Sequence, residues 1–274
     1  MNQAELDRIV QNAFAEDLPD ITSEAIFEPS DRGSARFLVK SEGVIAGLAV
    51  IETVFRTLDP AAEVVSLVED GTRVRPGDIV AHVSASVIAL LSGERTALNL
   101  MQRASGIASM TRRFVDAVVG TRAKIYDTRK TAPGLRALDK YAVAAGGGEN
   151  HRIGLHDMFL VKNNHIDRAG SITAAAERIR ARHMPQKLMI EVRDMRELEE
   201  ALAQNPDFIL LDNMNNEQLR EAVRRTNGRI PLEASGGITL ETVRGVAETG
   251  VDRISVGALT HSVTALDISM RIQA

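Results

Sequence analysis

The second half of the chain alternates short apolar runs with segments of helical periodicity. The runs lie at residues 124–126, 158–161, 188–192, 208–211, 231–233 and 253–256. Continuously apolar runs are typical of strands that are buried on both faces. Such strands, separated by helices, predict a parallel sheet covered by helices, closed either as an open doubly wound sheet or as an α/β barrel. No G-x-G-x-x-G motif follows the first run, so a dinucleotide-binding fold has no support.

Polar or glycine-rich groups lie at or just after the ends of these runs, and they decide between the two closures. The groups are Thr128-Arg129-Lys130, Lys162-Asn163-Asn164-His165, Glu191, Asp212-Asn213, Ser235-Gly236-Gly237 and Gly257-Ala258. In an α/β barrel the loops that follow the strands meet at one face. Six strand ends with such groups would then converge on one pocket, so the pattern favours a barrel.

The first hundred residues have a different pattern, which predicts an α+β domain. The first fourteen residues form an amphipathic helix with Leu6, Ile9, Val10 and Phe14 on one face. Strands are expected at residues 35–40, 44–46, 64–68 and 79–83, and a helix at 48–58. We expect an N-terminal domain over residues 1–108 and a barrel domain over residues 109–274, with a last helix that can pack back on the N-terminal domain.

A long helical pattern begins near residue 92. Ser92 is the expected N-cap, and Glu94 suits the positive end of the helix dipole. Arg95 would then lie in the first turn, where the dipole disfavours a cation. Either an external anion compensates for this cation, or Arg95 pairs with a nearby carboxylate at the surface.

Composition narrows the classes of function. The 274 residues are 44% hydrophobic and 26% charged, which is enough for a full core. An aromatic content of 3% without tryptophan argues against base-stacking surfaces, and therefore against nucleic acid. The net charge of −4 means that a cationic site must be local. The absence of cysteine excludes thiolate catalysis and Cys-ligated metals, and it fits a cytoplasmic location. No run approaches the length of about eighteen apolar residues that is needed to span a membrane.

Glycine-containing segments in the last two units are candidate phosphate-binding loops. Ser235 to Gly237 and Val256 to Ala258 offer main-chain N–H groups at expected loop-to-helix transitions, where barrels commonly bind phosphate. The alternative is that these are structural turns.

Four cations would reach the same face, which is more than one phosphate requires. They are Arg129, Lys130, Arg152 and Lys162. Arginine suits bidentate recognition of carboxylates, while lysine acts as a point charge. The ligand should therefore carry phosphate and carboxylate groups together.

The carboxylates Glu191 and Asp212 end neighbouring strands. They either pair with the cations, accept ribose hydroxyls, or hold Mg²⁺ through water. His151 beside Arg152 is as readily a structural donor as a functional group, and His165 is a further candidate to face the site.

These motifs resemble those of the quinolinate phosphoribosyltransferases, also called carboxylating nicotinate-nucleotide pyrophosphorylases, nearly from end to end. The matching motifs are Glu94 to Asn99, Ser105 to Ala108, Asp127 to Thr131, Pro133-Gly134, Asp139-Lys140-Tyr141, Gly146 to Gly148 with Asn150-His151-Arg152, Leu210 to Asn213, Glu233 to Ile238 and Val256 to Thr260. Two positions depart from the family pattern. Met189 stands where the family often has the first glutamate of E-V-E-V, and Asn163 stands where an aspartate is usual. Both departures leave the main binding positions intact but could alter metal dependence or rate.

The resemblance implies an N-terminal α/β sandwich, an incomplete α/β barrel of about six parallel strands, and a homodimer with shared active sites. Arg95 would reach the site of the neighbouring subunit. Arg129, Lys130, His151, Arg152 and Lys162, with Thr128, would surround quinolinate and the diphosphate. Glu191 and Asp212 would contact the phosphoribosyl group and its Mg²⁺, and Ser235–Gly237 with Val256–Ala258 would hold the phosphate. Lys130, Glu191 and Asp212 are the expected catalytic residues.

The implied reaction is phosphoribosyl transfer from 5-phosphoribosyl-1-diphosphate to quinolinate with decarboxylation, giving nicotinate mononucleotide, diphosphate and CO₂ in NAD biosynthesis. Two alternatives stay open: a paralogous pyrophosphorylase that acts on a different acid, and a non-catalytic sensor of a phosphorylated ligand. Retention of both Arg129 and Arg152 favours quinolinate, since two arginines suit two carboxylates.

Overall fold

The structure is a computed structural model that describes residues 1–273. Its contacts divide the chain into two compact units. Unit 1 comprises Met1–Arg112, Thr131–Gly147 and Leu259–Ala274, and unit 2 comprises Arg113–Lys130 and Gly148–Ala258. This division differs from the boundary expected after residue 108, because two later segments of the chain return to unit 1.

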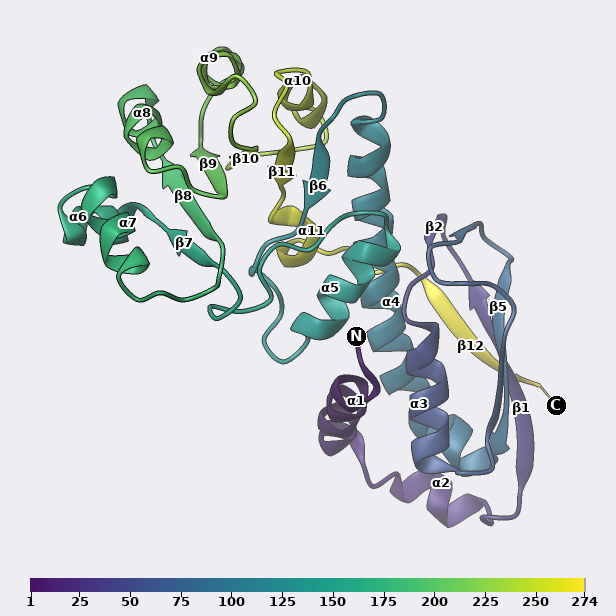
Figure 1. The fold of residues 1–274 in the computed structure, drawn as a ribbon. Helices are drawn as coiled ribbons and strands as arrows, with labels where there is room; N and C mark the ends of the chain where they lie inside the picture. The colour runs from purple at the N-terminus through teal and green to yellow at the C-terminus, as the bar shows by residue number, and fades with distance from the viewer. Residues whose placement is uncertain (274) are drawn as a thin grey trace. The chain divides into compact units, whose positions relative to one another are not determined.

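Unit 1 is built on an antiparallel sheet with the strand order β12-β1-β5-β3 (Figure 1). Its strands are β1 (Arg32–Val39), β2 (Gly43–Val44), β3 (Glu63–Ser66), β4 (Arg73–Val74), β5 (Ile79–Ser86) and β12 (Ile268–Gln273). Strands β2 and β4 pair separately. The helices that lie wholly or mainly in this unit are α1 (Gln3–Asp17), α2 (Ile21–Ile26), α3 (Leu48–Leu58), α4 (Val87–Ala117), α5 (Arg136–Ala145) and α11 (Ala258–His261). Unit 1 is therefore the α/β sandwich that the resemblance implied.

The amphipathic first helix is confirmed. Helix α1 buries Leu6, Ile9, Val10 and Phe14, the four residues that the pattern placed on one face. Asn2 starts the helix, because its side chain accepts a hydrogen bond from the N–H of Glu5 while the Glu5 side chain accepts one from the N–H of Asn2.

Helix α4 begins five residues before the expected N-cap. Strand β5 runs directly into it, and the Ser86 hydroxyl accepts a hydrogen bond from the N–H of Ala89 at 3.2 Å. Ser92 instead lies inside the helix and donates to the Asp20 carboxylate at 3.0 Å. Arg95 is therefore in the third turn, where the dipole of the helix N-terminus no longer acts on it. The expectation that Arg95 lies in the first turn was wrong.

The end of the chain is a strand rather than the expected helix. Strand β12 pairs with β1 in unit 1, with Met270 opposite Phe37 and Ile268 opposite Val39. Ile268 and Met270 are buried, whereas Arg271 is exposed. This alternation with a period of two is the physical reason for a strand.

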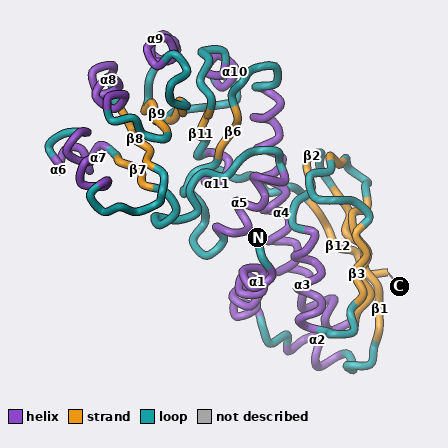
Figure 2. The backbone as a smooth tube through the Cα atoms, viewed as in Figure 1, coloured by secondary structure: helices purple, strands orange, loops and turns teal. Residues whose placement is uncertain are grey.

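Unit 2 is an open barrel of six parallel strands with the order β6-β11-β10-β9-β8-β7. The strands are β6 (Lys124–Tyr126), β7 (Phe159–Val161), β8 (Leu188–Val192), β9 (Phe208–Asp212), β10 (Leu232–Ser235) and β11 (Arg253–Ser255). The helices between them are α6 (Asn163–Ala169), α7 (Ile172–Arg180), α8 (Met195–Ala203), α9 (Asn216–Thr226) and α10 (Val243–Ala247). Figure 2 shows these helices lying along one side of the strands. The fold class expected from the sequence is confirmed.

Register gives the two faces of this sheet opposite character. Leu210 of β9 is aligned with Glu191 on one side and Glu233 on the other, and Glu233 is aligned with Arg253. The residues that alternate with them are apolar and buried: Ile190, Ile209, Leu211, Ala234 and Ile254. One face thus packs as an apolar layer, while the other carries the charged groups.

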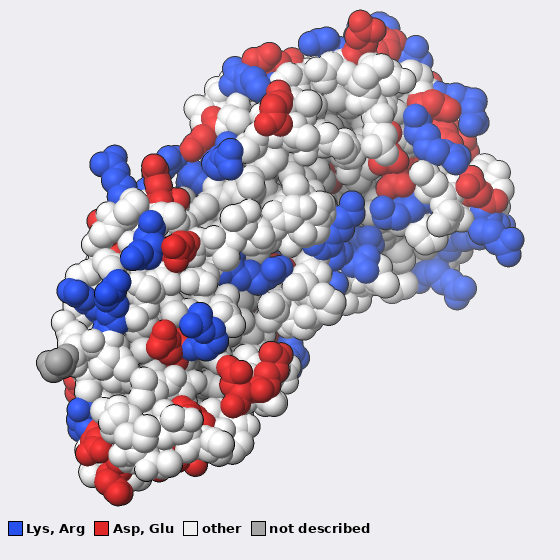
Figure 3. Space-filling view, turned by 180° about the vertical axis from the view of Figure 1, so that it is seen from behind, with Lys and Arg blue, Asp and Glu red and all other residues white. Residues whose placement is uncertain are grey.

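No helix in the described range 1–273 is long and apolar enough to cross a membrane. Acidic and basic side chains are interspersed over much of the face drawn in Figure 3. A cationic site is consequently a local feature, as the net charge predicted.

Candidate active site

Most residues that the sequence singled out lie in unit 2, in or just beyond the carboxyl-terminal halves of its strands. Thr128, Arg129 and Lys130 follow β6, Lys162 follows β7, Glu191 lies in β8, Asp212 ends β9, Ser235 ends β10, and Val256 to Ala258 follow β11. Because the strands are parallel, these ends share one edge of the sheet. Arg95 belongs to unit 1 and is exposed on α4.

Two arginines lie close together in unit 2 with donors that are not used. Arg152 is 9% exposed, and its Nη1 donates to the main-chain oxygen of Met158 at 3.1 Å. The Nε atoms of Arg129 and Arg152 are both buried without a hydrogen-bond partner. Burial and the charge of Arg129 lower the pKa of Arg152, which Asp157 opposes. Buried cations with unsatisfied donors form a binding place for an anion.

His151 is held by three groups of unit 2. Its main-chain N–H donates to Asp127 Oδ1 at 2.8 Å, which ties it to the end of β6. Its ring Nδ1 accepts a hydrogen bond from the N–H of Arg152 at 2.7 Å. Its Nε2 lies 3.3 Å from Oε1 of Glu233, a carboxylate that is fully buried. The side chain of His151 therefore faces the inside of unit 2.

Lys162 and Glu191 form an ion pair at the open edge of the barrel. The ammonium group of Lys162 donates to Glu191 Oε2 at 3.0 Å, and its side chain is half exposed while that of Glu191 is buried. Glu191 is aligned with Leu210, two residues before Asp212, so the carboxylates of Glu191 and Asp212 lie on the same face of neighbouring strands. No hydrogen bond or ion pair of the Asp212 carboxylate is found among residues 1–273.

Two carboxylates on one face fit Mg²⁺, which proteins hold through one or two carboxylates together with water and substrate phosphates. Among the described residues there is no group of three or more acidic or histidine side chains that could hold a metal. Any Mg²⁺ at Glu191 and Asp212 would therefore complete its coordination with oxygens of water or of the substrate.

The glycine loop after β10 is conformationally constrained. Gly236 and Gly237 have φ angles of +99° and +63°, in the left-handed region that favours glycine. A Cβ atom at Gly236 would lie 2.1 Å from Asn213 Oδ1, so the main chain approaches the end of β9 closely. The loop leads into helix α10, which begins at Val243, so five residues separate Gly237 from the helix.

The segment after β11 lies between the sheet and a short helix. The N–H of Val256 donates to the main-chain oxygen of Tyr126 at 2.9 Å and so continues the sheet. The four-residue helix α11 follows from Ala258.

Sequence reasoning missed the groups that support the site from inside the barrel. Glu233 accepts hydrogen bonds from His151 and from the Ser255 hydroxyl, and its Oε2 lies 3.4 Å from Arg253 Nε. The guanidinium of Arg253 stacks at 3.9 Å on the ring of Tyr126. The available signal was the spacing of Glu233 and Ser235, which places both side chains on the face that carries the charged groups.

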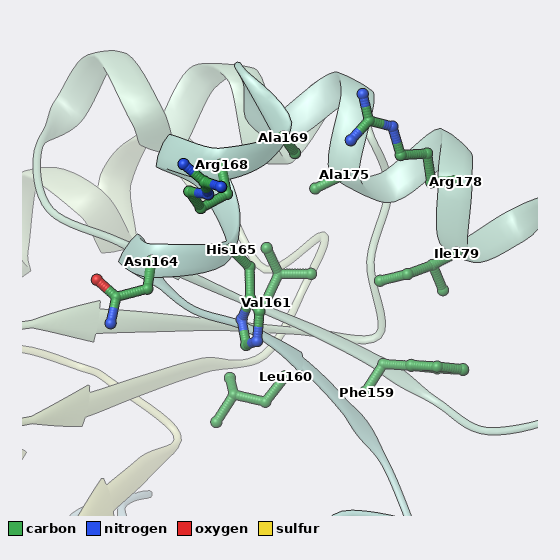
Figure 4. A pocket seen from close by; sticks show the side chains of 10 residues that line it. All are labelled: Phe159, Leu160, Val161, Asn164, His165, Arg168, Ala169, Ala175, Arg178 and Ile179. Atoms are coloured by element: carbon green, nitrogen blue, oxygen red, sulfur yellow. The ribbon is translucent and has the colours of Figure 1, made fainter.

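A separate hollow of about 440 Å³ lies against β7, α6 and α7. Phe159, Val161 and Ile179 line its apolar part, and the guanidinium groups of Arg168 and Arg178 lie at its rim (Figure 4). His165 points into this hollow, and its Nδ1 accepts a hydrogen bond from the N–H of Lys162 at 2.9 Å. His165 thus caps helix α6.

The comparisons with known proteins agree over the whole chain. The family model described as "Quinolinate phosphoribosyl transferase, C-terminal domain" matches residues 107–271, and the corresponding N-terminal model matches residues 20–105. The probable carboxylating nicotinate-nucleotide pyrophosphorylase of Bacillus subtilis is 44% identical over 276 residues, which cover 99% of this chain and 95% of that protein. The decarboxylating quinolinate phosphoribosyltransferase 2a of Nicotiana tabacum is 42% identical over 290 residues, which cover 98% and 82%.

Solved structures give the same result. The crystal structure of nicotinate-nucleotide pyrophosphorylase from Ehrlichia chaffeensis superposes with a TM-score of 0.94 at 40% identity, and the match covers 100% of this chain and 99% of that one. The similarity therefore extends over the secondary structure of both units.

Proposed function

The chain belongs to the quinolinate phosphoribosyltransferase family, and we propose that it carries out that family's reaction. Phosphoribose passes from 5-phosphoribosyl-1-diphosphate to the ring nitrogen of quinolinate. Diphosphate and CO₂ leave, and nicotinate mononucleotide is the product. This places the protein in NAD biosynthesis.

The pair Arg129 and Arg152 carries the proposal. Arg152 is buried and Arg129 is half-buried, their charges repel each other, and each keeps a buried Nε donor without a partner. Such a pair suits an anionic ligand with more than one negative group. Quinolinate supplies two carboxylates, and arginine binds a carboxylate in a bidentate geometry. Lys130 and Lys162 supply point charges for the diphosphate, and Thr128 precedes them at the end of β6.

Catalysis in this proposal is electrostatic and positional. Departure of diphosphate gives the anomeric carbon oxocarbenium character, which the carboxylates of Glu191 and Asp212 stabilise. Lys130 neutralises negative charge that builds on the leaving group. Mg²⁺, held by Glu191 and Asp212 together with the substrate, would supply further charge neutralisation when bound. The loops at Ser235–Gly237 and Val256–Ala258 hold the 5-phosphate.

Decarboxylation follows the transfer. Loss of CO₂ leaves an electron pair on the ring carbon beside the alkylated nitrogen, whose positive charge stabilises it. This carbon then takes a proton from water, which completes the C–H bond of nicotinate mononucleotide. Arg129 and Arg152 fix the dianion so that the ring nitrogen meets the anomeric carbon, and positioning of this kind lowers the entropic part of the barrier.

We further propose a homodimer in which Arg95 completes the site of the partner subunit. Arg95 is exposed, and no ion pair of its side chain is found within the described residues. A long exposed cation on α4 suits contact with an anionic ligand bound by a second copy. A cytoplasmic location is also proposed, and the absence of cysteine fits a reducing compartment.

The test is release of labelled CO₂ from the carboxyl group that is lost from quinolinate. We expect release that requires both 5-phosphoribosyl-1-diphosphate and Mg²⁺. Turnover of a different acid in place of quinolinate would instead indicate a paralogous pyrophosphorylase. Tight binding of phosphorylated ligands without any turnover would indicate a sensor.

A further inference from the structure

Both ring nitrogens of His151 are engaged inside unit 2. Nδ1 accepts a hydrogen bond from the N–H of Arg152 at 2.7 Å, so it carries no proton. Nε2 faces Glu233 Oε1 at 3.3 Å and is therefore the protonated nitrogen. The geometry selects one neutral tautomer and leaves neither nitrogen directed at a ligand.

Glu233 is built into the sheet as a fixed acceptor. Its side chain is fully buried in the middle strand β10. Oε1 accepts hydrogen bonds from Ser255 and His151, and Oε2 faces the guanidinium of Arg253. Donors on both carboxylate oxygens therefore give the Glu233 side chain a defined direction.

The contacts form one continuous path from the barrel interior to the substrate-binding arginine. Glu233 holds the ring of His151, and this ring holds the main chain of Arg152. Asp127 holds the main chain of His151 from the other side. The side chain of Arg152 donates to the carbonyl of Met158, while its Nε stays unsatisfied within residues 1–273. The direction of the guanidinium therefore depends on where its main chain is held.

We propose that Glu233 and His151 are positioning residues that fix Arg152 for the quinolinate carboxylate, and that His151 exchanges no proton with the substrate. The inference rests on the proposed function for its ligand. It assigns a positioning role to Glu233, which lies inside an apolar strand. It also restricts the role of His151 to connecting Glu233 with the main chain of Arg152.

Substitution of Glu233 tests the first half of the proposal. A glutamine has one oxygen instead of two, so it must turn its NH₂ group either toward Arg253, which can only donate, or toward His151 and Ser255, where the N–H of His151 loses its acceptor. We expect Glu233→Gln to raise the quinolinate KM about tenfold, as the loss of a charge-assisted hydrogen bond does, with kcat changed less than about threefold. The matched control is Glu149→Gln. The carboxylate of Glu149 accepts hydrogen bonds from Lys124 and Tyr126, and it contacts neither His151 nor Arg152. A wild-type KM in Glu233→Gln would overturn the proposal.

Substitution of His151 tests the second half. Asparagine can present its Oδ1 where Nδ1 accepts from Arg152, but it cannot reach Glu233. We expect His151→Asn to raise the quinolinate KM and to lower kcat less than about tenfold. A general acid or base contributes about 10²–10⁴-fold to the rate. A fall in kcat of a hundredfold or more at unchanged KM would therefore show proton exchange with the substrate and overturn the proposal.

A measurement without turnover separates this inference from the proposed function. The ¹⁵N spectrum of the histidine-labelled protein, with His151 assigned by its absence in His151→Asn, reports the protonation of each ring nitrogen. We expect Nε2 protonated and Nδ1 unprotonated at neutral pH, and loss of this fixed tautomer in Glu233→Gln. A ring protonated at Nδ1 in the wild type would overturn the positioning role even if quinolinate is turned over. Absence of turnover in the wild type would instead defeat only the proposed reaction.

Discussion

The ammonium group of Lys162 lies 3.0 Å from Glu191 Oε2, so a proposed diphosphate-binding cation is already paired with a proposed catalytic carboxylate. The side chain of Lys162 is 50% exposed and that of Glu191 is 7% exposed, which leaves the lysine accessible from solvent. An anion that binds Lys162 must compete with Glu191. The ion pair therefore lowers the affinity of Lys162 for an anion, while Glu191 supplies the negative charge that is proposed to act in the reaction.

The variant Glu191→Gln should bind inorganic diphosphate more tightly than the wild type. Its kcat for phosphoribosyl transfer should be lower. Half-exposed ion pairs contribute about 0.2–1 kcal/mol, so release of Lys162 should tighten binding up to about fivefold. Calorimetric titration with diphosphate in the absence of Mg²⁺ measures this change. The control is Glu177→Gln, which replaces an exposed glutamate on α7. Weaker or unchanged binding in Glu191→Gln would show that the pair does not compete with the ligand.

Removal of either Arg129 or Arg152 should weaken quinolinate binding without unfolding the protein. Arg129→Ala and Arg152→Ala each lose a charged hydrogen-bond donor worth about 1.5–3 kcal/mol, so the quinolinate KM should rise by about ten- to a hundredfold. Relief of the repulsion between the two guanidinium groups opposes any loss of thermal stability. Steady-state kinetics and thermal unfolding measure the two effects.

The matched control for this pair is Arg178→Ala, which removes an exposed arginine at the rim of the hollow against α7. Its quinolinate KM should equal that of the wild type. Wild-type kinetics in Arg129→Ala or Arg152→Ala would contradict the site assignment.

The fold of unit 2 was predictable because its strands are buried on both faces. The apolar runs at residues 124–126 and 188–192 coincide with β6 and β8, and the other four runs differ from their strands by at most two residues at an end. The start of α4 was not predictable from Ser92, since the capping hydroxyl belongs to Ser86 at the end of a strand. The end of the chain was predicted as a helix, although Ile268 and Met270 alternate with polar neighbours as in a strand.

The types of residue in the candidate site were predictable from the sequence. The contacts inside the barrel that hold these residues in place were not. Arg129 and Lys162 stand directly after apolar runs, so the barrel topology alone brings them to one edge. Glu233 lies within a run, and its partner His151 comes from a loop far earlier in the chain. No local pattern connects these two residues. Their contact depends on strand register and on the loop after α5.

Acidic pH should remove stability that comes from Glu197. Burial raises the pKa of this carboxyl, but hydrogen bonds from the side chain and main chain of Arg193, at 2.5–3.2 Å, outweigh it, so the pKa lies below its ordinary value. A carboxyl group whose pKa is lower in the folded state stabilises the protein at pH values above its pKa in the unfolded chain, which is about 4.3 for glutamate. This stability is lost as the pH falls through the pKa of the folded state.

The measurement is urea unfolding of the wild type and Glu197→Gln at pH 7 and at about pH 3.5, below the ordinary glutamate pKa. We expect the wild type to be the more stable protein at pH 7 and the difference to shrink at acid pH. A difference that is constant or grows at acid pH would show that the carboxylate is not stabilised by Arg193.

The close approach of Gly236 to β9 predicts the effect of a single methyl group. The φ angle of +99° is unfavourable for any residue with a side chain, at a cost of about 1–2 kcal/mol. The added Cβ would also lie 2.1 Å from Asn213 Oδ1, so the loop or the end of β9 must move. Gly228 offers a matched comparison, because its φ is +71° and a Cβ there meets nothing within 4 Å.

Gly236→Ala should therefore raise the KM for 5-phosphoribosyl-1-diphosphate at least about tenfold, because displacement of the main-chain N–H groups weakens phosphate binding at the loop. Gly228→Ala should lose a similar backbone stability of about 1 kcal/mol with an unchanged KM. Kinetics and urea unfolding of both variants separate strain from ligand binding. Equal KM values in the two variants would show that the loop after β10 does not bind phosphate, since Gly236 belongs to this loop and Gly228 does not.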